Sequence, residues 1–257
     1  MSHLLAAIVA APALAAAVEL AQPAGARLGI RLVSLLGALA SFAGAIAVAC
    51  TYDRATGGMQ MAESVPLVPA LGIDLRLAVD GWGVPLLVLT GIIVVTGVLA
   101  SWGVARRDKD FFVLLLVLVA GVFGVFVAQD LFVFFLFYEI AVLPMYLLIG
   151  IWGSSHTVEP RGPFAGVLKR FDVGGREYAA MKLTLMLLVG SAAILVAMFL
   201  LWNEAGARTF DLAVLEATHF SRTTQMIAFP LLWLGFGTLA GGFPFHTWSP
   251  DGHASAP

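Results

Sequence analysis

Long apolar runs separated by shorter polar stretches dominate the pattern of the chain. A helix needs about 20 mostly apolar residues to cross a bilayer, because the hydrocarbon core is about 30 Å thick and each residue rises about 1.5 Å. Helices are favoured over strands here, since an open strand would leave its backbone groups unpaired in lipid. The pattern therefore predicts an all-α fold, a polytopic bundle of transmembrane helices. About seven spans are expected, at residues 4–21, 30–50, 82–104, 111–128, 130–152, 179–202 and 223–243.

Tryptophans support the predicted boundaries independently of hydropathy, because their amphipathic rings prefer the headgroup region of a bilayer. Four of the six lie at or near predicted helix ends: Trp82, Trp102, Trp152 and Trp202. Two longer polar connections remain, at residues 51–80 and 153–178. The first alternates apolar and polar residues at 72–77, which is compatible with a short hairpin. No internal repeat is visible, so a single membrane domain over residues 1–257 is the simplest interpretation.

The distribution of Lys and Arg predicts the orientation in the membrane. Connections after the first, third and fifth spans, together with Arg31 at the start of the second span, hold nine of these residues, and those on the opposite side hold four. The positive-inside rule then makes 153–178 a cytoplasmic loop and 51–80 an extracytoplasmic loop, with the N-terminus outside. No Lys or Arg precedes the apolar stretch at 4–20, so it lacks the basic start of a signal peptide and is interpreted as a retained first helix.

Composition agrees with a membrane protein and argues against several other classes. The chain is 60% hydrophobic and 12% charged, with a mean hydropathy of +0.96 and a formal net charge of −2. Its basic residues are scattered, so no nucleic-acid partner is expected. Cys50 is the only cysteine and cannot form an internal disulfide, and the five histidines are too dispersed for standard ligand spacing. No haem, iron–sulfur or zinc site is predicted.

Glu139 is the most informative candidate residue, because apolar and aromatic residues surround it in the span 130–152. Nine residues beyond Asp130, it is expected about 13–14 Å deep, near the bilayer centre. An ionised carboxylate there costs at least about 2.5–3.5 kcal/mol, so Glu139 should be protonated or paired and should face protein or water. Such a group can exchange protons. The alternative is a structural carboxylate that only hydrogen-bonds a neighbouring helix. Pro144 frees the carbonyl of Ile140 and can leave a polar niche nearby.

Lys182 and His246 are the other two candidates. Lys182 lies about one turn inside the sixth predicted span, where it either snorkels to the interface or takes part in proton transfer. His246 lies in the stretch 241–253, which is full of helix breakers. Irregular backbone at membrane depth is tolerated where it is covered by protein or lines a cavity, so a broken helix beside a polar region is expected. His246 could carry protons there, or it and His253 could cap interfacial backbone.

Three stretches, in this order, carry a family resemblance: Phe-Leu-Phe-Tyr-Glu at 135–139 with Leu-Pro-Met-Tyr at 143–146, Arg-Glu-Tyr-Ala-Ala-Met-Lys at 176–182, and Pro-Phe-His-Thr-Trp-Ser-Pro-Asp-Gly-His at 244–253. Together they resemble the M-subunit family of proton-pumping NADH-quinone oxidoreductase (complex I), called subunit 4 in mitochondria. This family belongs to the antiporter-like superfamily, which also includes the L-type and N-type subunits and the Mrp-type antiporter subunits. The resemblance covers essentially the whole chain.

The resemblance implies half of an antiporter-like fold of about fourteen helices, with the N-terminal half present here and its seventh helix broken. In that family the fifth-helix glutamate pairs with a lysine on the seventh helix. Glu139 matches the glutamate, Lys182 a lysine often found on the sixth helix, and His246 the histidine of the break. The position of the seventh-helix lysine, seven residues before His246, is occupied by Leu239. Glu139 would then be neutral, pair with Lys182, or belong to a variant that pumps differently or not at all.

The leading hypothesis is a membrane-arm subunit that translocates protons through Glu139, Lys182 and His246 in the bacterial inner (plasma) membrane, coupled to quinone reduction elsewhere in the complex. The resemblance implies no redox centre in this chain, with NAD, FMN, iron–sulfur clusters and quinone held by other subunits. Expected partners are the L-type and N-type antiporter-like subunits and the lipid bilayer. The alternatives are an Mrp-type cation/proton antiporter subunit and a structural subunit that no longer pumps.

Overall fold

Two compact units make up the chain in the computed structural model, which describes residues 3–155, 166, 174–206 and 208–257. The first unit comprises Met1–Ala141 and Ala207–Thr218, and the second comprises Val142–Gly206 and His219–Pro257. Helix α5 (Leu131–Trp152) contributes to both units. The single membrane domain expected from the sequence stays a prediction.

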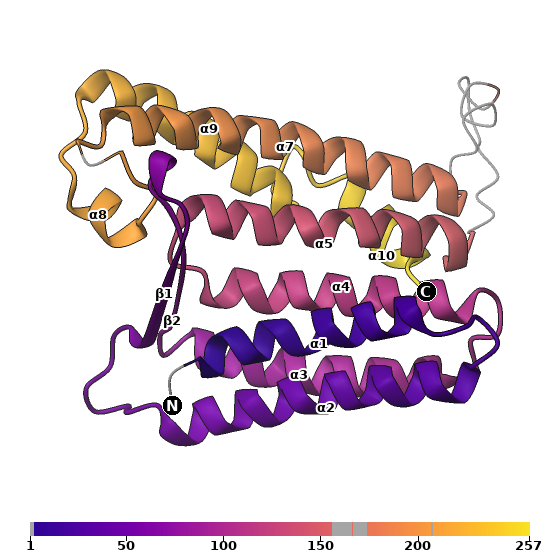
Figure 1. Cartoon of the computed structure of the whole chain (residues 1–257). Coiled ribbons are helices and arrows are strands. Elements are labelled where there is room, and N and C mark those ends of the chain that lie inside the picture. Colours follow the sequence, from indigo (N-terminus) through magenta and orange to yellow (C-terminus); the bar gives the residue numbers. More distant parts are fainter. Residues whose placement is uncertain (1–2, 156–165, 167–173, 207) are drawn as a thin grey trace. The chain divides into compact units, whose positions relative to one another are not determined.

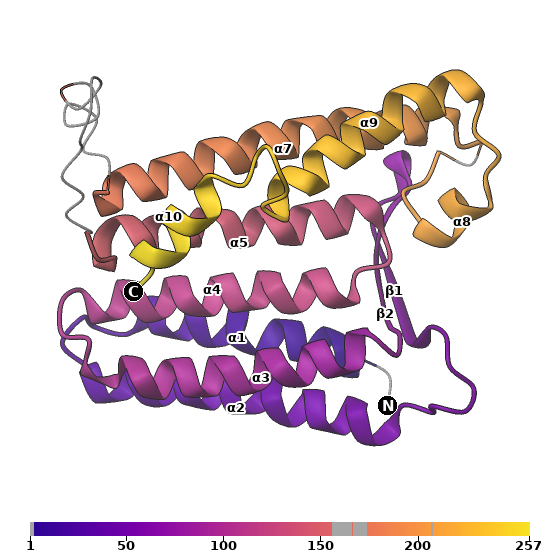
Figure 2. The same ribbon diagram turned by 180° about the vertical axis from the view of Figure 1, so that it is seen from behind.

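The first unit is built mainly from four long helices, which run alongside one another in Figures 1 and 2. They are α1 (Leu4–Ala21), α2 (Arg27–Thr51), α3 (Gly83–Ala100) and α4 (Asp108–Val127). A short 3-10 turn, η2 (Ser101–Gly103), extends α3. Helix α4 packs against the other three, and more than half of its apolar window is buried. The remaining helices keep apolar side chains on their exposed faces, as expected for contact with lipid or other subunits.

A β-hairpin occupies the polar connection between α2 and α3, as the alternation at residues 72–77 indicated. Strand β1 (Gln60–Val68) pairs antiparallel with β2 (Ile73–Val79), so that Val65 lies opposite Leu75. The turn between them is a 3-10 segment, η1 (Pro69–Leu71), followed by Gly72 at a φ of 66°. A Cβ at Gly72 would lie 2.2 Å from the carbonyl oxygen of Arg208, so glycine is required here both by conformation and by space.

In the second unit, α7 (Arg176–Glu204) and α9 (Arg222–Leu239) pack closely through small residues. A Cβ at Gly235 of α9 would lie 2.8 Å from the backbone oxygen of Gly190 and 2.4 Å from Ile194 Cγ1. Small side chains at a helix crossing let the backbones approach, which is a common basis of helix packing in membranes. The short helix α8 (Leu212–Ala217) belongs to the first unit.

Six of the described helices are long and apolar enough to span a membrane, and they coincide with the first six predicted spans. The seventh predicted span, 223–243, is helical only as far as Leu239, where α9 ends, and α9 is not among these six. Its first turn, Arg222–Gln225, is polar, which lowers its hydropathy. Helix α9 ends at Leu239. The chain then passes through turns and a cis Phe243–Pro244 bond before it becomes helical again in α10 (Trp248–Ser255). The expected helix break is therefore present.

The two predicted loops have different outcomes. Residues 51–80 form the hairpin, whereas most of 153–178 lies outside the described residues, namely 156–165 and 167–173. The side of the membrane on which each loop lies stays a prediction.

Candidate functional site

Lys182 forms an ion pair that the sequence analysis did not foresee. It lies in the second turn of α7, and its Nζ donates a hydrogen bond to Oδ2 of Asp251 on α10 at 2.7 Å. The ammonium also lies 5.6 Å from the centroid of the Tyr178 ring, within cation–π range. The side chain of Lys182 is 21% exposed and that of Asp251 is 41% exposed. Lys182 is thus held by a carboxylate of its own unit.

The helix break places Asp251 beside Lys182. Trp248 is buried at the start of α10, and its Nε1 donates to the carbonyl of Thr238 on α9 at 2.9 Å. Gly252 lies so close to α7 that an added Cβ would be 2.7 Å from Leu183 Cδ1. At the end of α10, the carbonyl of Ser255 accepts from the Ser154 backbone N–H at 3.0 Å. These contacts fix α10 against α7. As a result, the carboxylate of Asp251, one turn into α10, reaches the ammonium of Lys182.

His246 and His253 have different environments in the second unit. His246 lies in the break itself and is exposed there, with its ring 5.7 Å from that of Phe243. Nδ1 of His253 lies 2.7 Å from the carbonyl of Ser249, so this ring donates to backbone within α10. The capping role considered for the two histidines stays a prediction. Proton transfer at His246 stays a prediction.

Leu239, at the position where the family resemblance implies a lysine, packs against α7. A Cβ at Gly190 would lie 2.7 Å from Leu239 Cδ1. Leu239, the last residue of α9, thus makes an apolar contact at the position where a lysine was expected. The neighbouring Thr238 is buried, and its hydroxyl donates a hydrogen bond to the carbonyl of Leu234 at 2.7 Å.

Glu139 is half-buried on the part of α5 that belongs to the first unit. This part packs tightly on α4: Gly121 would place a Cβ 2.7 Å from the backbone oxygen of Phe137, and Gly124 would place one 2.3 Å from the Phe137 ring. Close packing of two helices thus fixes the turn that carries Glu139. Lys182 and His246 belong to the second unit, so a pairing of either with Glu139 stays a prediction.

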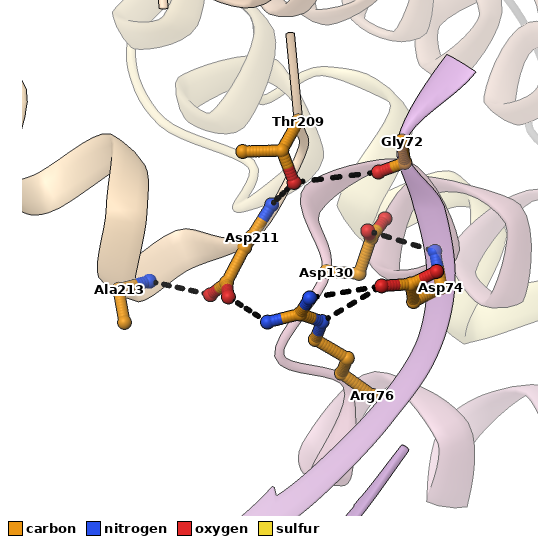
Figure 3. Close-up of polar contacts among 7 residues, drawn as sticks. All are labelled: Gly72, Asp74, Arg76, Asp130, Thr209, Asp211 and Ala213. Atoms are coloured by element: carbon orange, nitrogen blue, oxygen red, sulfur yellow. Dashed lines mark hydrogen bonds and ion pairs between the residues drawn. The ribbon is translucent and has the colours of Figure 1, made fainter. Parts of the chain in front are cut away.

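A second charged cluster, shown in Figure 3, lies in the first unit at the end of the hairpin. Arg76 of β2 donates to Oδ2 of Asp74 through Nη2 at 2.8 Å and through Nε at 3.2 Å. Its Nη1 donates to Asp211, which also caps α8 by accepting from the Ala213 N–H at 3.0 Å. Hydrogen bonds to the carboxylate of Asp74 raise the pKa of the Arg76 guanidinium, with further contributions from the nearby acids. Arg76 therefore joins the hairpin to a segment far along the chain.

Asp130 completes this cluster from the start of α5. It is fully buried, and its carboxylate accepts from the backbone N–H groups of Phe132 and Val133, both at 3.0 Å, and of Asp74 at 3.3 Å. The first two bonds cap the helix, as an aspartate at this position commonly does. Burial raises the pKa of the Asp130 carboxyl above its usual range, despite these three hydrogen bonds. The sequence did not predict a role for Asp130 beyond marking the start of the span that contains Glu139.

The sequence carried part of the signal for this cluster. Asp130 directly precedes an apolar run, which is a helix-start signal. Asp74 and Arg76 lie two residues apart on a strand and therefore on one face. Their contact with Asp211 depends on tertiary structure, because Asp211 lies 135 residues beyond Arg76. Within the described part of the chain, no group of three or more His, Cys, Asp or Glu side chains has an arrangement that could hold a metal ion.

Comparison with known proteins identifies a family match for the C-terminal part of the chain. Residues 163–257 match the family described as NADH:quinone oxidoreductase/Mrp antiporter, TM. The NAD(P)H-quinone oxidoreductase chain 4 1 of Nostoc sp. is 38% identical over 256 residues, covering 98% of this chain and 44% of the relative. The protein of the same name from Synechococcus elongatus is 36% identical over 228 residues, covering 88% and 39%. The chain thus spans less than half the length of these relatives.

Solved structures agree with this match. A chain of respiratory complex I from Thermus thermophilus with bound NADH superimposes with a TM-score of 0.80 at 26% identity, covering 98% of this chain and 47% of that one. A chain of the Mrp complex from Dietzia sp. shares the fold, with a TM-score of 0.68 at 20% identity over 98% of this chain and 25% of that one. The chain is therefore similar over nearly its whole length to antiporter-like membrane subunits of NADH:quinone oxidoreductases, and its residues 163–257 match the family that such subunits share with Mrp antiporters.

Proposed function

We propose that this chain is part of a membrane-arm subunit of NADH-quinone oxidoreductase, in which it moves protons while quinone is reduced elsewhere in the complex. The observation that carries the proposal is the ion pair between Lys182 of α7 and Asp251 of α10, the helix that follows the break. A lysine paired with a carboxylate keeps its proton, and it can release the proton when the pair opens and the ammonium is left in an apolar setting. Because Asp251 lies beyond the break, a movement of α10 relative to α7 would open the ion pair.

Glu139, Lys182 and His246 are the proposed proton-transfer residues, and Asp251 is the group that holds the Lys182 charge. Glu139 supplies a carboxyl group in the first unit, and His246 supplies an exposed imidazole in the break.

The remaining parts of the proposal concern the assembly. The partners are other membrane subunits of the complex, including those of the L-type and N-type, and the surrounding lipid. NAD, FMN, iron–sulfur clusters and quinone belong to other parts of the complex, so this chain contributes to the enzyme without a redox centre of its own. The proposed location is the bacterial plasma membrane, with the N-terminus outside.

The proposal is tested in membrane vesicles that contain the assembled complex with Lys182→Met or Glu139→Gln in the full-length subunit. Both changes keep an extended or isosteric side chain and remove a titratable proton, so the ratio of protons moved to NADH oxidised should fall. Glu216→Gln, an exposed position on α8, is the matched control and should leave the ratio unchanged. Normal ratios in both site variants would refute proton transfer by these residues.

An Mrp-type cation/proton antiporter is the second candidate function, favoured by the shared fold with the Mrp complex. Vesicles distinguish the two: transport driven by a sodium gradient without NADH supports the antiporter, and transport that depends on NADH oxidation supports the oxidoreductase. A third candidate, a structural subunit, is suggested by Leu239, because an apolar contact replaces the charge expected there.

A further inference from the structure

The seam between α1 and α2 in the first unit contains a buried acid that the proposed function does not use. Glu19 of α1 and Ser34 of α2 are both 0% exposed. One turn before Glu19 on α1, Ala15 Cβ would lie 2.6 Å from a Cβ added at Gly37 of α2, which shows how closely the two helices approach. The Glu19 carboxyl group is therefore buried in a tightly packed helix seam.

The cations on the packed elements are engaged elsewhere among the described residues. On α2, Arg27 pairs with Asp108 at 3.6 Å. Arg31, also on α2, donates to the carbonyl of Val104 at 3.2 Å and lies 5.9 Å from the Trp102 ring centroid. On α4, Lys109 donates to two backbone carbonyls at the end of α1, those of Leu20 at 2.8 Å and Gln22 at 2.7 Å.

The other charged groups near α1 are also engaged away from the seam. At the start of α4, Asp110 pairs with Arg107. Glu63 of β1 accepts from the backbone N–H groups at the opposite end of α1, and the charges of β2, Asp74 and Arg76, bind each other. Within the described part of the chain, Glu19 thus has no charged partner. An ionised carboxylate in that setting would lack compensation, and buried acids avoid this by binding a proton.

The hydrogen-bond count at Ser34 leads to the same conclusion. Its Oγ lies within hydrogen-bond distance of Oε1 of Glu19 and 3.0 Å from the carbonyl of Ile30. A hydroxyl group has one proton, so it can donate to only one of these two oxygens. A protonated Glu19 resolves this: its O–H donates to Ser34 Oγ, and the Ser34 O–H donates to Ile30. Oε2 of Glu19 is buried with no hydrogen-bond partner among the described residues, which suits a neutral acid better than a carboxylate.

We propose that Glu19 and Ser34 form a proton-binding site between α1 and α2, in which Glu19 is held as the neutral acid at neutral pH. The ligand is the proton itself. The site is separate from Lys182 and Asp251 and does not depend on the function proposed above. It would give the first unit a protonatable carboxyl group in addition to those of Glu139 and Asp130.

Infrared spectroscopy of the chain in lipid nanodiscs at neutral pH tests the site. Glu19→Gln, which keeps the shape of the side chain, should remove one carbonyl-stretch band of a protonated carboxyl group. The control, Glu216→Gln, should remove only carboxylate absorption, because Glu216 is exposed. Loss of carboxylate absorption in Glu19→Gln would overturn the proposal.

A second variant keeps the proposal falsifiable if Glu19→Gln does not fold. Ser34→Ala removes the acceptor of the Glu19 O–H, so the protonated carboxyl band should remain and move to higher frequency. A band that stays at the wild-type frequency would show that the acid does not donate to Ser34. Disappearance of the band would show that no proton is held there without the hydroxyl group, which would contradict the burial argument.

Discussion

Individual side chains in the first unit illustrate how one cation can organise several acids. Arg76 is about one-third exposed, and it binds Asp74 with two donors and Asp211 with a third. Paired, planar contacts of this kind are the strong form of a guanidinium–carboxylate interaction. Without the guanidinium, the two acids would lie near each other and near Asp130 and would lose the positive charge that binds them.

Replacement of Arg76 should therefore destabilise the first unit. We expect Arg76→Met to lower the free energy of unfolding by about 2 kcal/mol, less than for a fully buried pair because solvent screens the exposed part of the side chain. Arg54→Met provides the control, since Arg54 is exposed and has no hydrogen bond or ion pair among the described residues. Thermal unfolding in detergent micelles measures the difference. Equal midpoints for both variants would mean that the cluster contributes nothing.

The buried carboxyl group of Asp130 should make stability depend on pH. Its pKa is raised by burial in the folded chain, so its contribution to stability is fully present below its unfolded pKa of about 4 and is lost as pH rises through the raised value. Asp130→Asn cannot titrate but retains an oxygen that can cap α5. Relative to wild type, this variant should gain stability as pH increases from about 4 to 7. Unfolding profiles that stay parallel over this range would contradict the effect.

At the scale of elements, glycines determine how closely neighbouring helices pack. Gly235 of α9 lies against Gly190 and Ile194 of α7, whereas a Cβ at Gly237, two residues further along α9, would meet nothing within 4 Å. The two positions therefore share a helix and a similar depth but differ in what they face. This contrast separates the effect of packing from that of helix propensity.

Gly235→Val should weaken the α7–α9 crossing, because the added carbons would overlap Ile194 and the backbone of Gly190. Overpacking typically costs about 1–3 kcal/mol. Gly237→Val introduces the same side chain into open space and should change stability by less than about 0.5 kcal/mol. Chemical denaturation followed by tryptophan fluorescence tests both variants. A similar loss for the two would show that helix propensity, rather than contact, dominates.

The helices themselves could be predicted from the sequence, because hydropathy over about 20 residues depends only on local composition. The first six predicted spans and the break after Leu239 are confirmed. The partners of the charged residues could not be predicted in the same way. Lys182 and Asp251 lie 69 residues apart, and Asp251 reaches the lysine only because Trp248 and Gly252 fix α10 on α7. The sequence analysis therefore identified Lys182 without its acid.

For the whole molecule, the arrangement of spans determines which loops share a side of the membrane. Single cysteines at exposed positions in a Cys50→Ser chain test this. In the predicted orientation, Arg54→Cys, before the hairpin, and Glu216→Cys, on α8, lie outside the cell. Both should therefore react with an impermeant maleimide added to intact cells. Arg107→Cys, between α3 and α4, should be protected. Labelling of Arg54→Cys and Glu216→Cys from different sides would contradict the fold.

The ion pair of Arg76 with Asp211 also constrains how the chain is made. Four of the six candidate spans lie between the two residues. An even number of crossings returns the chain to the side on which it started, so both residues can meet in the same aqueous layer. A ribosome-bound chain that skipped or inverted one crossing would leave Arg76 and its distant acid on opposite sides of the lipid. The salt bridge thus closes only after correct insertion of the intervening helices.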